Sequence, residues 1–122
     1  MTPSRMRKPE YRMMRTFDER IPLLLETPAA VRWISAEPLL GPIDLRGAGL
    51  DWVVAGGESG PRARPTDPEW VRSLRNQCEY LGVPFFFKQW GGVCPKAGGR
   101  VLDGRTWDGM PRLAEAARRG AA

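Results

Sequence analysis

A short apolar run that breaks into glycines constrains this chain more than any other stretch: residues 50–60 read LDWVVAGGESG. Residues 52–55 have no polar side, which predicts a strand buried on both faces of a sheet. The glycines that follow let the backbone turn tightly and let a ligand approach to contact distance. The spacing matches neither a dinucleotide-binding fingerprint nor a Walker loop, so it indicates no nucleotide. Taken alone, the stretch fits equally well a strand that simply leaves a sheet.

Two other apolar stretches end in polar residues in the same way. Residues 31–36 predict a strand that ends at Glu37, where the following proline stops the hydrogen-bond ladder. Residues 83–87 predict a third strand, which ends in Lys88 and Gln89. Residues 39–45, between the first two strands, are expected to be a loop whose apolar side chains form a hydrophobic plug.

The helix signals are clearest after the central strand. Asp67 is the expected N-cap, Pro68 takes the first helical position, and Gly82 provides a left-handed end. Apolar residues repeat at intervals of three and four, which predicts one buried face made of Trp70, Val71, Leu74, Cys78 and Leu81.

Weaker signals predict three further elements. Asp18 is expected to cap an earlier helix that ends at Glu26. Residues 100–107 carry Asp-Gly between two short apolar segments, which indicates a hairpin. Residues 113–119 have a weak helix propensity.

The length of 122 residues is enough for one domain with a core, or for part of a domain. Residues 1–15 show no clear periodicity and are predicted to be disordered or weakly helical. Residues 16–111 are expected to form the folded part and residues 112–122 a flexible tail. No apolar run is long enough to span a membrane, and the N-terminus lacks the apolar stretch of a secretory signal. With two cysteines and no histidine, the chain shows no metal-ligand pattern, and we expect reduced thiols in the cytoplasm.

The net charge of +5 belongs to the ends of the chain. Residues 1–15 contain five basic residues and one acidic residue, and residues 112–122 contain three and one. Residues 16–111 contain eleven basic and twelve acidic residues, which leaves no basic face. Basic ends can bind phosphate backbones non-specifically, although solvated tails are the commoner case.

The order of elements predicts where the polar residues meet. Helix, strand, loop, strand, helix and strand follow one another, so parallel β/α packing would place the three carboxyl ends at one rim. The carboxylates, hydroxyl, ammonium and amide there could bind an amine, a sugar hydroxyl or a metal-held phosphate, or could form salt links that only close a barrel end. With no histidine and no visible nucleophile–base pair, acyl-transfer catalysis is not favoured. The candidate ligand-binding residues are Glu37, Gly56, Gly57, Glu58, Ser59, Lys88 and Gln89.

Several blocks of the sequence resemble a known phage family. SAEP, GGESGP and FFFKQWG occur in order, within a match that runs from about Asp18 to Arg112. The family is named after gene products thirty-seven and sixty-eight and is a domain of unknown function with a radical-S-adenosylmethionine-like barrel. The resemblance therefore implies an α/β fold, namely a partial β/α (TIM-type) barrel of about three parallel strands with two flanking helices and a C-terminal hairpin.

The departures from this family shape the functional expectation. Full-length members resemble a complete barrel whose N-terminal half carries cysteines for an iron–sulfur cluster, used with S-adenosylmethionine, and this chain lacks those cysteines. Cys78 and Cys94 do not match them, and Gly56-Gly57-Glu58 follows a late strand, so its role toward S-adenosylmethionine is not carried over. The chain is expected to hold no cofactor and to be inactive alone. It would leave two strand edges unpaired and would need a separate N-terminal half or self-association.

A second interpretation assigns the chain to a different functional class, that of binding proteins. A small binding or accessory protein could use the same rim for an unknown substrate, with non-specific nucleic-acid contacts through its basic ends.

Overall fold

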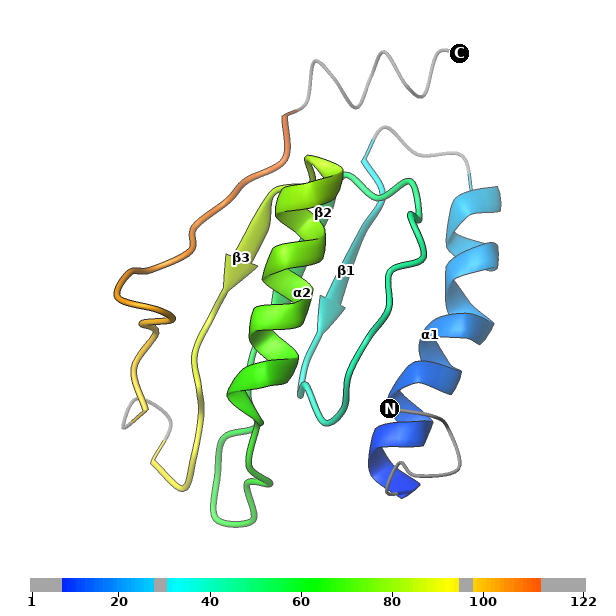
Figure 1. Cartoon of the computed structure of the whole chain (residues 1–122). Coiled ribbons are helices and arrows are strands. Elements are labelled where there is room, and N and C mark those ends of the chain that lie inside the picture. Colours follow the sequence, from blue (N-terminus) through cyan, green and yellow to red (C-terminus); the bar gives the residue numbers. More distant parts are fainter. Residues whose placement is uncertain (1–7, 28–30, 95–97, 113–122) are drawn as a thin grey trace.

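The computed structural model describes residues 8–27, 31–94 and 98–112 (Figure 1). Two helices and a three-stranded, all-parallel open sheet form a small α/β fold, which confirms the predicted class and the order of its elements. The tail expected to form a weak helix at residues 113–119 lies outside the described residues. The elements are α1 (Lys8–Glu26), β1 (Trp33–Ala36), β2 (Trp52–Ala55), α2 (Pro68–Leu81) and β3 (Phe85–Phe87).

The middle strand, β2, pairs with β1 on one edge and with β3 on the other. The register places Ser35 of β1 opposite Val54, and Val54 opposite Phe86 of β3. Val53 and Ala55, on the face toward the helices, are fully buried. On the other face Val54 is buried but Trp52 is only half-buried, so the two-sided burial that the composition predicts is confirmed in part.

Helix α2 begins and ends at the residues that the sequence signals indicate. The Asp67 side chain accepts a hydrogen bond from the Glu69 backbone N–H, and Pro68 occupies the first turn. Gly82 ends the helix with φ at 71°, a conformation that costs glycine little. Of its predicted buried face, Val71, Leu74 and Cys78 are fully buried and Trp70 packs partly buried against the core. The prediction is wrong for Leu81, which is 38% exposed in the last turn.

Helix α1 confirms the predicted helix and extends back to Lys8, well before the expected Asp18 cap. Its apolar stripe begins before that aspartate, because Phe17 and Ile21 are buried and Met13 and Met14 pack against the core. The stripe repeats at three and four residues, which is the spacing that holds a helix against a core. Residues 8–15, predicted as disordered or weakly helical, therefore belong to the helix.

The core lies between the helices and one face of the sheet. Both helices run opposite to the strands (Figure 1), and a single cluster of buried residues joins them to Val53, Ala55, Phe85 and Phe87. Leu39, Ile43 and Leu45 of the loop after β1 are buried in the same cluster, which confirms the hydrophobic plug. The cluster leaves out the alternate residues of each strand, such as Val54, because they point to the opposite face.

The outer edge of β3 is paired, which corrects the expectation of two open sheet edges. The Phe87 N–H donates to the Trp107 carbonyl, and the Gly109 N–H donates to the Phe85 carbonyl, both at 2.9 Å. An antiparallel bridge between Phe86 and Asp108 lies between these bonds. Residues 107–109 thus cover this edge, whereas β1 has no second strand neighbour among the described residues.

The predicted hairpin positions the segment that covers β3. Leu102 and Arg105 form its single bridge, and Asp103 and Gly104 between them both have positive φ, as a tight two-residue turn requires. The Asp103 carboxylate pairs with Arg72 and Arg75 of α2, and these arginines hold its pKa below the ordinary value. The turn is therefore fixed to α2 as well as to the sheet.

The cap of α2 gives the first test. We expect Asp67→Ala to lower the free energy of unfolding by about 1 kcal/mol, because the Glu69 N–H loses its acceptor. Asp67→Asn keeps an acceptor oxygen at the same place and should cost clearly less. Urea denaturation followed by circular dichroism measures both; equal losses would contradict the assigned cap.

Candidate functional site

The sheet face that points away from the helices carries side chains in three rows. We call it the open face and define it by Trp33, Ser35, Glu37, Trp52, Val54, Gly56, Phe86 and Lys88. The first row joins Trp33 to Trp52, with ring centroids 4.8 Å apart. The second follows from the register as Ser35, Val54 and Phe86. The third comprises Glu37, Gly56 and Lys88, just past the carboxyl ends of the strands, where α/β sheets commonly bind ligands.

The third row holds an ion pair above a glycine. Lys88 Nζ lies 3.3 Å from Glu37 Oε1, and the Ser35 hydroxyl donates to Glu37 Oε2 at 2.7 Å. A Cβ at Gly56 would stand 2.6 Å from Glu37 Oε1, so the missing side chain makes room for the carboxylate. The Lys88 side chain is 48% exposed and that of Glu37 25%, which leaves the pair accessible to a ligand.

Glu58 has its partner elsewhere on the rim. Its carboxylate accepts hydrogen bonds from the backbone N–H of Arg64 and from the guanidinium of the same residue. These bonds lower the pKa of Glu58 from 4.5 to about 2. The candidate carboxylates thus pair separately, Glu37 with Lys88 and Glu58 with Arg64.

The remaining candidate residues join two backbone segments beyond the strands. The Gly57 N–H donates to the Gln89 carbonyl, and Gln89 Nε2 donates to the Gly57 carbonyl. A Cβ at Gly57 would lie 1.8 Å from the Trp90 carbonyl oxygen, and one at Gly91 would lie 2.2 Å from that of Glu58. Gly57 and Gly91 are needed for backbone contact, so Gly57 supports the rim rather than lines the open face. Gln89 does both, because its Nε2 also lies 3.3 Å from the Cβ position of Gly56.

Ser59 lies beside a shallow depression on the same rim. Its backbone forms a parallel bridge with Gly92, which continues the pairing of the two segments. The depression measures about 590 Å³ and is lined by Glu58, Ser59, Gly60, Pro61, Arg62 and Arg64.

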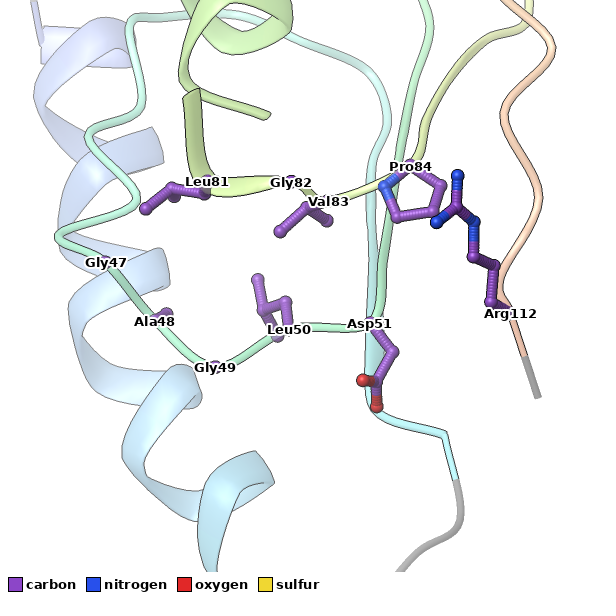
Figure 2. A pocket seen from close by; sticks show the side chains of 10 residues that line it. All are labelled: Gly47, Ala48, Gly49, Leu50, Asp51, Leu81, Gly82, Val83, Pro84 and Arg112. Atoms are coloured by element: carbon purple, nitrogen blue, oxygen red, sulfur yellow. The ribbon is translucent and has the colours of Figure 1, made fainter. Parts of the chain in front are cut away.

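A more enclosed pocket lies at the opposite end of the strands, where β2 and β3 begin (Figure 2). Leu50 and Val83 point toward each other across it, and Asp51 and Arg112 stand at one side. Its volume of about 210 Å³ is below the roughly 300–1,000 Å³ of ordinary ligand pockets. Asp51 Oδ2 accepts the Arg32 backbone N–H at 2.9 Å and so ties the starts of β1 and β2 together. This pocket contains none of the candidate residues.

The two cysteines do not fit an iron–sulfur cluster. Cys78 is fully buried in the core under α2, and burial raises the pKa of its thiol to about 12. Cys94 is exposed and follows β3. No three candidate metal ligands come together within the described residues. Neither described helix is long and apolar enough to cross a membrane.

Sequence reasoning missed two residues of this region. Ser35 could have been found, because it stands two positions before Glu37 on a strand and so shares its face. Arg64 gave no such signal, because it lies in an irregular loop whose path only the structure defines.

Substitutions at Gly56 and Gly57 distinguish the candidate site from the backbone that supports it. We expect Gly57→Ala to destabilise the protein by about 3 kcal/mol or more, because the new methyl group meets backbone that cannot move aside. Gly56→Ala meets only the ends of two side chains, Glu37 and Gln89, and should cost about 1 kcal/mol or less, while it displaces the Glu37 carboxylate from Lys88. Chemical denaturation of both variants tests the contrast, and similar losses would show that both glycines are structural.

The Glu58–Arg64 pair predicts a dependence on pH. Because folding lowers the pKa of Glu58, the pair stabilises the fold above about pH 4.5, and this contribution is lost as the pH falls toward 2. Arg64→Met should raise the pKa of Glu58 from about 2 toward its ordinary value, because the guanidinium bonds are lost and only the bond from the backbone N–H of residue 64 stays. Arg62→Met, in the same loop, should leave it low. Carboxyl-carbon NMR titration measures the pKa, and an unchanged value in Arg64→Met would rule out this pairing.

Comparison with known proteins gives one match. No curated protein and no solved structure matches the chain. A family model described as a protein of unknown function, DUF5131, matches residues 12–111. That range begins inside α1 and includes the whole sheet, the third row and the segment that covers β3. The chain therefore belongs to the DUF5131 family of proteins of unknown function.

Proposed function

We propose that this chain supplies the C-terminal strands of a β/α barrel and contributes the Glu37–Lys88 row to a ligand site at its rim. Alone, the chain would bind rather than catalyse. The observation that supports this is the open face: an apolar row at the amino ends of β1 and β2 and a mixed row in the middle lead to an accessible ion pair at the carboxyl ends of the strands. In β/α barrels the interior is filled by such layers, and the site lies at the carboxyl rim.

The ligand follows from the charges of the third row. Glu37 offers a carboxylate and Lys88 an ammonium, with their closest N and O atoms 3.3 Å apart. A molecule that carries an ammonium and a carboxylate can exchange partners with this pair without leaving either charge unpaired. Gly56 keeps the floor beneath them free of a side chain. The ligand class that fits best is therefore a small zwitterion of the amino-acid type.

Two functions expected from the sequence, radical-S-adenosylmethionine chemistry and nucleic-acid binding, stay predictions. The radical-S-adenosylmethionine chemistry of the phage family would need ligands for its cluster from another polypeptide, because Cys78 and Cys94 do not fit it. Nucleic-acid contact through the basic ends concerns segments that lie largely outside the described residues.

Titration followed by amide NMR tests the site. Glycine, methionine and S-adenosylmethionine serve as probes, because they share an α-ammonium and an α-carboxylate and differ in size. We expect at least one of them to shift the amide signals of Gly56 and Lys88. Glu37→Gln and Lys88→Met should abolish these shifts, whereas Asp18→Asn, which breaks a surface ion pair with Arg46, should retain them. Shifts that survive in Glu37→Gln, or no shift with any probe, would contradict the proposal.

A further inference from the structure

We propose that Arg100 is a positioning residue for the candidate site, because its guanidinium fixes the backbone from which Lys88 reaches Glu37. The inference rests on the proposed function, since it takes the Glu37–Lys88 pair as the ligand site. It goes beyond that function by assigning a role to Arg100 and by making the geometry of the site depend on residues 107–109.

The Glu37–Lys88 pair spans the width of the sheet. Lys88 follows β3 and Glu37 follows β1, and the middle strand lies between them. Neighbouring strands lie about 4.8 Å apart, so the two side chains together bridge roughly 10 Å of sheet. Lysine has a flexible four-carbon stem, and a small rotation of its backbone is magnified at the ammonium. The ammonium therefore has a defined place only where the backbone of Lys88 is held.

The backbone of Lys88 is held by two different partners. Its N–H donates to the Ala55 carbonyl of β2 at 2.9 Å, as the last bond of the β2–β3 pairing. Its carbonyl accepts a hydrogen bond from Arg100 Nε at 3.1 Å. Arg100 Nη2 also donates to the Phe87 carbonyl at 3.4 Å. Arg100 thus supports the chain at the point where strand pairing ends.

The guanidinium of Arg100 is itself fixed by two further contacts. The Asp108 carboxylate accepts a hydrogen bond from Nη2, and this bond holds the pKa of Asp108 below its ordinary value. The centre of the guanidinium lies 5.2 Å from the centroid of the Phe86 ring. A planar fork of donors can join two carbonyls and a carboxylate in this way, whereas a lysine ammonium is a point charge.

Residues 107–109 do not need Arg100 to stay on β3. The Phe87 N–H donates to the Trp107 carbonyl, and Gly109 is bound through both its N–H and its carbonyl. By contrast, Arg100 provides the hydrogen bond to the Lys88 carbonyl. Loss of the guanidinium should therefore affect Lys88 more than the pairing of β3 with these residues.

The carboxyl-carbon NMR signal of Glu37 in the free protein is the first measurement. Lys88→Met gives the signal of the unpaired carboxylate. We expect Arg100→Met to move the signal clearly toward that value. Arg100→Lys should move it in the same direction, because it restores the charge without the fork. Arg105→Met is the matched control: its guanidinium stacks 3.7 Å from the Trp107 ring centroid, and the signal should stay at the wild-type value.

The affinity for glycine is the second measurement. We expect Arg100→Met and Arg100→Lys to bind glycine about tenfold more weakly, which corresponds to about one lost hydrogen bond. Arg105→Met should bind glycine like the wild type. Asp108→Asn leaves the carbonyl bonds of Arg100 in place and should lose less affinity than Arg100→Met. Amide hydrogen exchange of Phe87 and Gly109 should stay slow in all four variants, which shows that residues 107–109 remain paired.

Four results would overturn the inference. They are an unchanged Glu37 signal in Arg100→Met, an equal movement in Arg105→Met, full recovery in Arg100→Lys, and fast exchange of Phe87 and Gly109 in Arg100→Met. The Glu37 signal is recorded without ligand, so it reports the role of Arg100 even where glycine does not bind the wild type. Failure of the ligand site and failure of the positioning role are thus distinguishable.

Discussion

Pairing of β2 on both edges is the constraint on which the rest of this structure depends. Parallel strands are stable when both of their faces are buried, and here one face is buried by the helices and by the loop after β1. The register then aligns every second residue of the three strands on the other face. The rows of the open face, including the ion pair, are a direct result of this pairing.

The glycines after β2 have different tasks, although they are adjacent. Gly57 allows two backbone segments to touch, and a side chain there would overlap the Trp90 carbonyl. Gly56 faces the opposite way, toward the Glu37 carboxylate and Gln89 Nε2. A glycine-rich turn at a strand end can thus be both scaffold and site, and only the direction of each missing side chain separates the two.

Much of the fold could be predicted because its signals are local. The cap at Asp67, the left-handed Gly82 and the apolar repeat between them define α2 without any tertiary information. The start of α1 was harder to predict, because Met13 and Met14 belong to its stripe only through their packing against the core, where Met14 also accepts the Asp44 N–H of the loop after β1. The pairing of residues 107–109 with the edge of β3 could not be predicted, because it is made by backbone hydrogen bonds, which no pattern of side chains indicates.

The candidate site was predictable to a similar degree. Strand ends indicated Glu37 and Lys88, and the register brings them together. Glu58 follows a strand just as Glu37 does, but its carboxylate pairs with Arg64, six residues later, and not with Lys88. Which of several charges meet at a rim depends on loop conformation, and short-range patterns do not encode that.

The central claim is that the Glu37–Lys88 pair serves ligand binding rather than stability. A double-mutant cycle with Glu37→Gln, Lys88→Met and the double variant, measured by urea denaturation, tests it most directly. For a pair as exposed as this one, we predict a coupling energy of about 1 kcal/mol or less. A coupling energy of about 3 kcal/mol or more would show a structural salt bridge and contradict this account.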